Sequence, residues 1–229
     1  MKKSNKLLLG GFITVLLILC VLHITLYAKY KNGQYTIYNP ENDVPPASMQ
    51  LFPAIQFVSI SDIPNARVQF TDVARIAKRE QDWIRYEKKG DTLLITAREG
   101  VRQDGHAASF SLPFNTTMSL SNATITFNEG KQAGENNPVI YAQNSRVIFS
   151  SMANQFRLGN VRIVASKNSF ILFDGKTSVN HLDLQLSGSA IEYAEGEIGQ
   201  LSIVTDSVSR ISLQSKHLLK ANIKTPGRE

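Results

Sequence analysis

The commonest pattern in this chain is a short stretch of alternating apolar and polar residues, a polar corner, and a second alternating stretch. LDLQLSGSAIEY, residues 182–193, shows it clearly: leucines alternate with Asp183 and Gln185, and Ser-Gly-Ser separates them from the next stretch. A period of two places successive side chains on opposite faces of a β-strand. Each such unit therefore predicts two short strands joined at a tight corner.

Six segments share this pattern. They are FVSISDIPNARVQF (57–70), MSLSNATITF (118–127), VIYAQNSRVIF (139–149), VRIVASKNSFILF (161–173), LDLQLSGSAIEY (182–193) and LSIVTDSVSRISL (201–213). The corner residues taken as equivalent are Ala123, Ser145, Ser169, Ser189 and Ser207, at spacings of 22, 24, 20 and 18 residues. A repeat near 20 residues suits one coil of a β-solenoid, whereas turns in sandwiches and barrels recur about every 8 to 12 residues. The sequence predicts an all-β fold, a single-stranded β-helix or solenoid-like stack of short strands.

The corners are built from small or polar residues. Stacked corners of a solenoid lie about 4.8 Å apart and favour residues that tolerate unusual backbone angles. Asn122, Asn144, Asn168 and Gly188 meet that requirement. We expect the Ser and Asn side chains to form a stabilising ladder between coils, with a row of ligand-binding groups as the alternative.

The alternation also predicts which side chains fill the interior. In the last two coils, Asp183 and Gln185 should face water because they lie out of phase with the leucines. The residues expected inside are Leu182, Leu184, Leu186, Leu201 and Ile203.

Residues 7–28 form an uncharged apolar run of 22 residues. At 1.5 Å per residue this run can cross a hydrocarbon core of about 30 Å, which predicts an uncleaved transmembrane signal anchor. A cleavable signal peptide is the alternative, but cleavage after Ala28 would place bulky Leu26 where small residues are needed, and the run is long for such a signal. Lipid attachment at Cys20 is a third alternative, although Leu19 precedes it instead of a small residue.

The predicted organisation has four parts. These are a cytoplasmic tail (1–6), the transmembrane signal anchor (7–28), a linker (29–50) and an extracytoplasmic β-solenoid domain (51–229). Three lysines precede the anchor and two follow it, which favours a cytoplasmic N-terminus. The expected location is a single pass through the inner (cytoplasmic) membrane, with the C-terminal domain in the periplasm.

The net charge of +6 is concentrated at the N-terminus. Five of the 25 basic residues lie in the first 31 positions and all 19 acidic residues lie beyond them, so the rest of the chain carries 20 minus 19, or +1. A nearly neutral body lacks the basic field that nucleic-acid binding requires. Cys20 is the single cysteine of the sequence, so disulfides do not hold the body together.

The segment from residue 71 to 100 interrupts the repeat. Lys89-Gly90-Asp91 predicts a turn, and we expect a hairpin that continues the sheet or covers the first coil. A basic patch for anionic glycans or lipids could be formed by Arg75, Lys78, Arg79, Arg85, Lys88 and Lys89. Because Glu80, Asp82 and Glu87 are interspersed, a solvated surface of mixed charge is the favoured interpretation.

Candidate catalytic chemistry is sparse. The sequence has no G-x-S-x-G, H-E-x-x-H, phosphate-loop or CxxC motif. His181 and Asp183 would share one strand face, but two metal ligands without a third are a weak site. Three carboxylates, Glu192, Glu195 and Glu197, could supply acid/base chemistry, although YAEGEIG is more simply an exposed acidic loop. We assign no catalytic, cofactor-binding or metal-binding residue, and treat the sequons at Asn115 and Asn122 as chance matches.

The stretches FVSISDIPNARVQF, WIRYEKKGDTLLITAR (83–98) and LQLSGSAIEY together resemble GIN-domain proteins of bacteria, the auto-transporter adhesin head family. The resemblance covers roughly residues 55–215 and rests on patterns of alternation. It implies an envelope protein with a stacked β-strand body and brings no established catalytic residues. This sequence differs from the family pattern in having few corner glycines and an apparent membrane span.

Three functions remain open. The first is a non-enzymatic, membrane-anchored binding or structural module that contacts an unknown envelope polymer or protein. The second is a carbohydrate-active β-helix enzyme, which would need a cleft with converging carboxylates. The third is a bactofilin-like scaffold that polymerises end to end, which would need an apolar, uncapped end.

Overall fold

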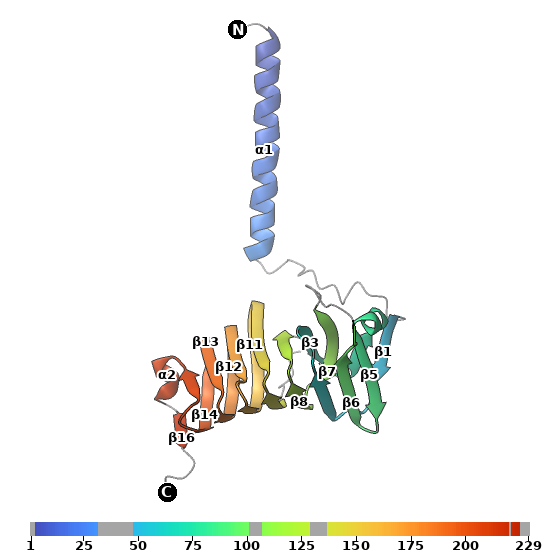
Figure 1. Ribbon diagram of the computed structural model, residues 1–229. Coiled ribbons are helices and arrows are strands. Elements are labelled where there is room, and N and C mark those ends of the chain that lie inside the picture. The colour runs from blue at the N-terminus through green and yellow to red at the C-terminus, as the bar shows by residue number, and fades with distance from the viewer. Residues whose placement is uncertain (1–2, 32–47, 101–106, 129–136, 220, 225–229) are drawn as a thin grey trace. The chain divides into compact units, whose positions relative to one another are not determined.

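The computed structural model describes residues 3–31, 48–100, 107–128, 137–219 and 221–224 (Figure 1). It divides into two compact units, Met1–Val44 and Pro45–Glu229. Residues 32–47, most of the predicted linker 29–50, lie outside the described residues. The first strand of the second unit begins at Met49, two residues before the predicted start of the domain.

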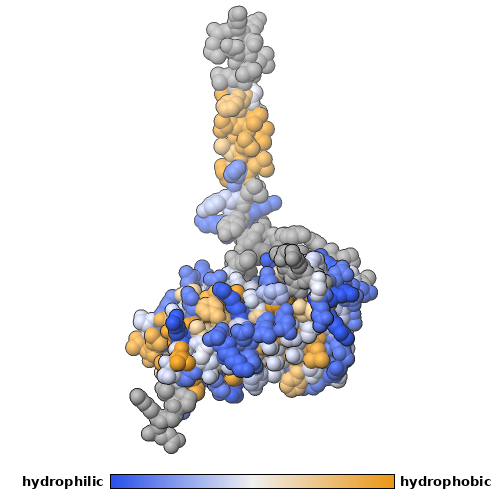
Figure 2. All heavy atoms as spheres, in the orientation of Figure 1, coloured by the Kyte–Doolittle hydropathy of each residue, from blue (hydrophilic) through white to orange (hydrophobic). Residues whose placement is uncertain are grey.

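The first unit contains helix α1 (Lys3–Lys31). It forms because a run of Leu, Ile and Val without proline has no competing turn signal. Its polar side chains bond within the helix: Thr25 Oγ1 donates to Val21 O (2.7 Å), and His23 Nδ1 lies 3.1 Å from Leu19 O. By length and composition, Gly11–Lys29 can cross a membrane, and its side chains form an apolar surface in Figure 2. An apolar N-terminal helix is therefore present as predicted.

The second unit is a stack of short strands arranged in two rows. In spatial order, the first row contains β5 (Ile84–Lys89), β6 (Thr92–Ala97), β2 (Phe57–Ser61), β8 (Thr117–Ser121), β10 (Val139–Gln143), the second halves of β11 (Arg146–Ser166) and β12 (Phe170–Ser187), β14 (Ile198–Thr205) and β16 (Ala221–Lys224). The second row contains β1 (Met49–Phe52), β4 (Ala74–Ala77), β7 (Ala108–Pro113), β3 (Ala66–Thr71), β9 (Thr124–Asn128), the first halves of β11 and β12, β13 (Ala190–Glu195) and β15 (Arg210–Ser212). Two short helices lie at opposite ends of the strand stack in space. They are η2 (Lys78–Asp82), beside β4 and β5, and α2 (Ser215–Leu218), beside β14 and β16. The predicted solenoid-like β fold is confirmed.

Successive coils are in parallel register over most of the stack. Ile140 pairs with Met118 on one side and with Ile163 on the other, and Leu184 pairs with Ile203 in the next coil. Buried residues alternate with more exposed ones over β8, β10 and both halves of β12, as a period-two pattern requires. The leucines and Ile203 expected inside are all buried, so the register predicted for the last coils is correct.

A column of aromatic rings runs through the interior of the stack. Neighbouring centroids are 5.3 Å apart for Phe70 and Phe127, 5.1 Å for Phe127 and Phe149, 4.5 Å for Phe149 and Phe173, and 4.9 Å for Phe173 and Tyr193. Most of these rings occupy equivalent positions in parallel strands, so each stacks on its neighbour. Such contacts add to the free energy gained from burying each ring.

Tyr193 is the last tyrosine or phenylalanine of this column. Its hydroxyl donates to Thr177 O (2.6 Å) and lies 3.3 Å from Glu197 O. Burial raises the pKa of the Tyr193 phenol above its usual value, and the charge of Glu197 adds to the rise. The phenol therefore stays a neutral hydrogen-bond donor in the core.

The corners form the ladder that the sequence predicts. Asn144 Nδ2 donates to Asn122 Oδ1 (2.8 Å), and Asn122 Nδ2 donates to Asp62 Oδ1 (3.0 Å). Asp62, Asn122 and Asn144 all have positive φ, which short polar side chains tolerate. Alongside them, the backbone N–H of Ser145 donates to Ser169 Oγ (3.2 Å). The Asn and Ser rows therefore join one coil to the next.

Two features of the repeat differ from the sequence prediction. Ala190 pairs with Arg210, so Ser209, and not Ser207, is equivalent to Ser189. The last corner is longer because the Asp206 carboxylate accepts bonds from the N–H groups of Val208 and Ser209 and so closes a turn.

The second difference is the order of the coils. The β2–β3 coil lies between the β6–β7 coil and the β8–β9 coil, although it comes first in the sequence. This arrangement explains why Asp62 bonds to Asn122 across 60 residues.

The predicted hairpin of the interrupting segment is present. Strands β5 and β6 are antiparallel, and β6 pairs with β2, so the hairpin continues the first row. In the second row, β1 runs antiparallel to β4. We call this end, formed by β1, β4, η2 and β5, the capped end, and the end formed by β15, α2 and β16 the open end.

Candidate functional site

The three carboxylates considered for glycoside chemistry are exposed. Glu192 and Glu195 belong to β13, and Glu197 precedes β14. Glu197 Oε1 accepts a hydrogen bond from Lys216 Nζ at 2.7 Å, so it forms an ion pair with the segment after β15. The glutamates of YAEGEIG are therefore exposed as predicted, but the segment is a tight turn at Gly196 and Glu197 between β13 and β14, with Tyr193 and Ile198 buried on either side.

This loop is closely packed against the preceding coil. A Cβ atom at Gly196 would lie 1.8 Å from Thr177 O, and Gly196 has a φ of +109°. A side chain at this position would force the backbone apart. The glycine therefore allows the backbone of this segment to approach the neighbouring strand closely.

His181 and Asp183 share one face of β12 but bond to different neighbours. His181 Nδ1 lies 3.0 Å from Gln200 Oε1 of the next coil, and Asp183 Oδ2 lies 3.6 Å from Arg162 Nε of the previous coil. Among the described residues, no group of three His, Cys, Asp or Glu side chains could hold a metal ion. Their contacts give both residues a role in joining coils.

The sequon asparagines lie in the turns on either side of β8. Asn122 uses both atoms of its side-chain amide in the corner ladder. Asn115 Oδ1 accepts a weaker bond from Asn137 Nδ2 at 3.4 Å.

The charged residues between 71 and 100 form a mixed surface, as expected. Arg75 pairs with Asp72 (2.7 Å), and Lys89 pairs with Glu87 (3.3 Å). Glu80 differs from the expected solvated carboxylate because its side chain is 1% exposed, with Arg79 Nε 3.5 Å away. Lys88 Nζ donates to Pro53 O (2.8 Å) and so ties β5 to the segment after β1.

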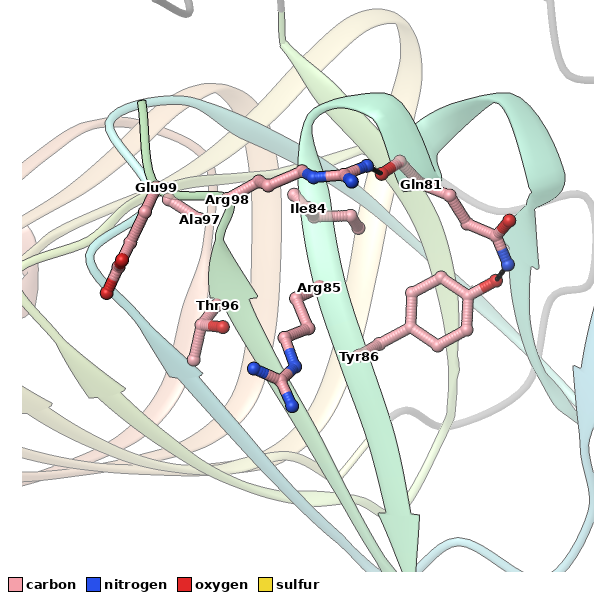
Figure 3. A pocket seen from close by; sticks show the side chains of 8 residues that line it. All are labelled: Gln81, Ile84, Arg85, Tyr86, Thr96, Ala97, Arg98 and Glu99. Carbon is pink, nitrogen blue, oxygen red and sulfur yellow. Dashed lines mark hydrogen bonds between the residues drawn. The ribbon is translucent and has the colours of Figure 1, made fainter. Parts of the chain in front are cut away.

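A pocket of about 700 Å³ lies on the capped end, over the β5–β6 hairpin (Figure 3). Its lining comes from η2, both hairpin strands and the two residues after β6. The lining residues are Gln81, Ile84, Arg85, Tyr86, Thr96, Ala97, Arg98 and Glu99.

Hydrogen bonds hold one wall of this pocket in place. Gln81 Nε2 donates to Tyr86 Oη (2.5 Å), and Tyr86 Oη donates to Gln50 Oε1 of β1 (2.9 Å). Arg98 Nη1 donates to Gln81 O (3.0 Å). The rings of Tyr86 and Phe52 meet edge to face with centroids 5.4 Å apart. The pocket wall is therefore fixed to both rows of strands.

The pocket is lined by two arginines, Arg85 and Arg98. Arg98 donates to Gln81 O, so Arg85 is the one whose guanidinium can bind a ligand. It is exposed, and it pairs across the hairpin with Thr96, beside which its side chain lies in Figure 3. Within the described parts of the chain, no carboxylate lies at ion-pair distance from its guanidinium. The arrangement can bind an anionic group through Arg85, with the Thr96 hydroxyl close by.

The sequence singled out Arg85 only as one member of a basic patch. Gln81, Tyr86, Thr96 and Arg98 were not identified, although the turn at residues 89–91 sets the pairing of Arg85 with Thr96. The bond from Tyr86 to Gln50 spans 36 residues and carries no local signal in the sequence.

Comparisons with known proteins do not assign this chain to a family. No family model matches this chain, and no curated protein matches it. One solved structure, described as a "putative cell adhesion protein" from Clostridium sporogenes, is 9% identical, with coverage of 77% of this chain and 93% of that one, at a TM-score of 0.24. A TM-score this low does not establish a common fold.

Proposed function

We propose that this protein is a non-enzymatic binding module of the bacterial cell envelope that holds an acidic polysaccharide at its capped end. A single-pass N-terminal anchor keeps it in the inner membrane, with the strand stack in the periplasm. The observation that carries the proposal is Arg85, an exposed guanidinium in a pocket with a fixed wall and without an acidic partner among the described residues.

The location is supported by α1 and by the distribution of lysines around it. Gly11–Lys29 is long and apolar enough to cross a membrane. Lys2, Lys3 and Lys6 outnumber the two lysines that follow, which favours a cytoplasmic N-terminus. The resemblance of the strand and corner pattern to GIN-domain proteins also favours the envelope.

The ligand class follows from the chemistry of the pocket. A guanidinium binds carboxylate or phosphate through two parallel hydrogen bonds. The Thr96 and Tyr86 hydroxyls add groups that bond to sugar hydroxyls. Because the corner ladder and the aromatic column hold the hairpin's neighbours in place, ordering the site on binding costs little entropy.

The non-enzymatic part of the proposal is supported by the positions of the carboxylates. Glycoside hydrolysis uses two carboxyl groups on either side of the scissile bond. The pocket lining includes one, Glu99, whereas Glu192, Glu195 and Glu197 lie exposed on β13 and the loop after it.

Binding of the full-length protein to polygalacturonate, with uncharged dextran as reference, tests the proposal. We expect the wild type to prefer polygalacturonate, and Arg85→Gln to weaken that binding about tenfold through loss of a charged hydrogen bond. Arg67→Gln is the matched control, since Arg67 is an exposed arginine on β3. It should bind like the wild type.

Equal losses in the two variants would show nonspecific attraction to positive charge and would overturn the site. The polymer recovered after incubation should keep its length, and the triple variant Glu192→Gln, Glu195→Gln, Glu197→Gln should bind normally. Shortening of the polymer by the wild type, but not by the triple variant, would replace this proposal with a carbohydrate-active enzyme.

A further inference from the structure

A line of polar side chains crosses the first row of strands and begins beside Arg85. The strand register pairs each member of this line with the next across β6, β2, β8 and β10, and its members are Thr96, Ser61, Ser121 and Gln143. We call these four residues the polar line. Arg85 lies opposite Thr96 on β5, so the line starts at the pocket. The residue before each member is buried, so the polar line faces away from the core.

The fold does not use the side chains of the polar line. In the corners, the hydroxyls of Ser145, Ser169 and Ser189 each donate to a backbone carbonyl. The hydroxyl and amide groups of the polar line, in contrast, bond to no other residue in the described ranges of the chain. These groups can therefore donate to and accept from a ligand without breaking a bond of the fold.

An exposed aromatic ring lies beside the far end of the polar line. Tyr141 is 45% exposed and precedes Gln143 by two positions, so both side chains lie on the same face of β10. Two positions along a strand correspond to about 7 Å. A tyrosine ring at this distance can contact a sugar ring that lies over Gln143, with its apolar face against the sugar and its hydroxyl in water.

The surface between Arg85 and Tyr141 carries no charge. The outward positions of β6, β2, β8 and β10 hold hydroxyl, amide or apolar side chains. The carboxylate of Asp62, at the corner after Ser61, already accepts a hydrogen bond from Asn122. An acidic chain on these strands therefore meets no carboxylate, and its binding removes no protein charge from water.

We propose that the polysaccharide held at Arg85 continues along the polar line, with about one sugar residue for each strand and a ring packed on Tyr141. This inference rests on the proposed function and adds the direction in which the chain lies. Neighbouring strands are about 4.8 Å apart, which is close to the length of one sugar residue in an extended chain. The four strand spacings from Arg85 to Gln143 cover about 19 Å, so the surface takes about five residues.

The pairing of the strands favours a polysaccharide over an extended peptide. β6, β2, β8 and β10 are each paired on both edges, so none offers a backbone edge to an added strand. What these strands offer is polar side chains repeated at a constant spacing. A polymer that repeats its hydroxyl groups at a similar spacing fits such a surface.

Galacturonate oligomers of two and six residues test the proposal in calorimetric titrations of the full-length protein. The shorter oligomer can contact Arg85 and Thr96 but cannot reach Tyr141, whereas the longer one can cover the polar line. We expect the wild type to bind the longer oligomer at least tenfold more tightly.

Two substitutions at the far end of the line should remove much of this preference. Tyr141→Ala should weaken binding of the longer oligomer about fivefold, because the ring contact is lost. Gln143→Glu keeps the shape of the side chain and adds a negative charge, which should cause a similar loss through repulsion of the ligand carboxylates. Both variants should bind the shorter oligomer like the wild type, which also shows that they fold.

Matched controls place the same changes away from the line. Phe57 is 46% exposed on the same face, but it precedes Ser61 by four positions and so lies about 13 Å from the line. Gln69 faces outward on β3 of the second row. Phe57→Ala and Gln69→Glu should leave the affinity for both oligomers unchanged.

Arg85→Gln separates this inference from the proposed function. It should weaken binding of both oligomers, and unchanged binding of the shorter one would overturn the site at Arg85 itself. If Arg85→Gln acts as expected but the wild type binds both oligomers equally, the path along the polar line is wrong. Equal losses from Tyr141→Ala and Phe57→Ala with the longer oligomer would also overturn the path and leave the site at Arg85 in place.

Discussion

The two ends of the strand stack are built differently. At the capped end, both rows finish with antiparallel pairs, β5 with β6 in the first row and β4 with β7 and then β1 with β4 in the second, and the bond from Tyr86 to Gln50 ties the rows together. At the open end, the parallel ladders stop at β15 and β16, and α2 covers the interior with His217. Both ends cover the hydrophobic core. Only the capped end adds a hairpin whose position is held by hydrogen bonds, and the open end has no added strands in the described residues.

This difference shows that a solenoid has two separate needs at its ends. The interior must be kept from water, because exposed core residues lose the free energy of burial. The strand edges must be paired, covered or left for a partner. A four-residue helix, α2, meets the first need, whereas the second takes added strands such as β5 and β1.

The largest expected effect concerns a strand that is paired on both edges, in contrast to the strands at the two ends. Leu184 is fully buried, whereas the Asp183 side chain is 29% exposed. Leu184→Asp should unfold a soluble fragment of residues 47–229, because an unpaired buried carboxylate costs several kcal/mol, on the order of 3 or more. Asp183→Leu should be nearly neutral. Circular dichroism during heating measures both, and equal tolerance of the two changes would contradict the register described here.

A smaller effect compares the cores of the two ends. Ile84 at the capped end is 1% exposed, whereas Ile211 at the open end is only partly buried. Ile84→Ala should lower the free energy of unfolding by about 3 kcal/mol, and Ile211→Ala by about 1 kcal/mol, since less apolar surface loses its packing. Urea unfolding of the dilute protein measures the difference. Similar losses would mean that the open end is as well packed as the capped end.

The smallest effect concerns the last corner, which is held by the Asp206 carboxylate, whereas the corners at Asn122 and Asn144 use side-chain amides. Bonds from the Ser209 hydroxyl (2.6 Å) and from backbone N–H groups lower the pKa of Asp206 below its usual value. The ionised group therefore stabilises the fold above the unfolded-state pKa of about 3.9, and this contribution is lost as the pH falls through the lower folded-state pKa. Asp206→Asn should lower the melting temperature at neutral pH, and the gap from wild type should shrink below about pH 4.

Ser209→Ala is the control for this titration, since it removes the strongest donor and keeps the carboxylate. It should show a weaker dependence on pH than the wild type in the same range. A gap that widens in acid would contradict the lowered pKa of Asp206.

Much of the fold could be predicted from the sequence because the signals are local. Alternation identified the strands of the six repeat segments and placed Leu184 inside and Asp183 outside, since a period of two assigns faces without reference to distant residues. Asn122 and Asn144 were recognisable as corners because short polar side chains tolerate positive φ. The uncharged run of residues 7–28 likewise predicted an apolar helix from its composition and length.

The candidate site could be predicted only in part. The sequence showed Arg85 as one of several cations. Whether Arg85 can bind a ligand depends on which neighbouring cations form ion pairs with Asp72, Glu80 and Glu87. Those ion pairs depend on how the segment around η2 and the hairpin folds. The burial of Glu80 and the hydrogen bond from Tyr86 to Gln50 likewise depend on tertiary folding and carry no local signal in the sequence.

The sequence by itself determined the strands of the six repeat segments and of the hairpin, most of the corners, the interior faces of the last coils and the apolar helix, because each depends on residues within a few positions of one another. It did not identify β1, β4, β7 or β16, which lie outside the repeat pattern. The tertiary structure decided the order of the coils, the equivalence of Ser209 with Ser189, and the contrast between the two ends. Those features depend on which strand edges meet. Edges of similar strands offer the same backbone groups, so side-chain packing across the whole stack selects the partner.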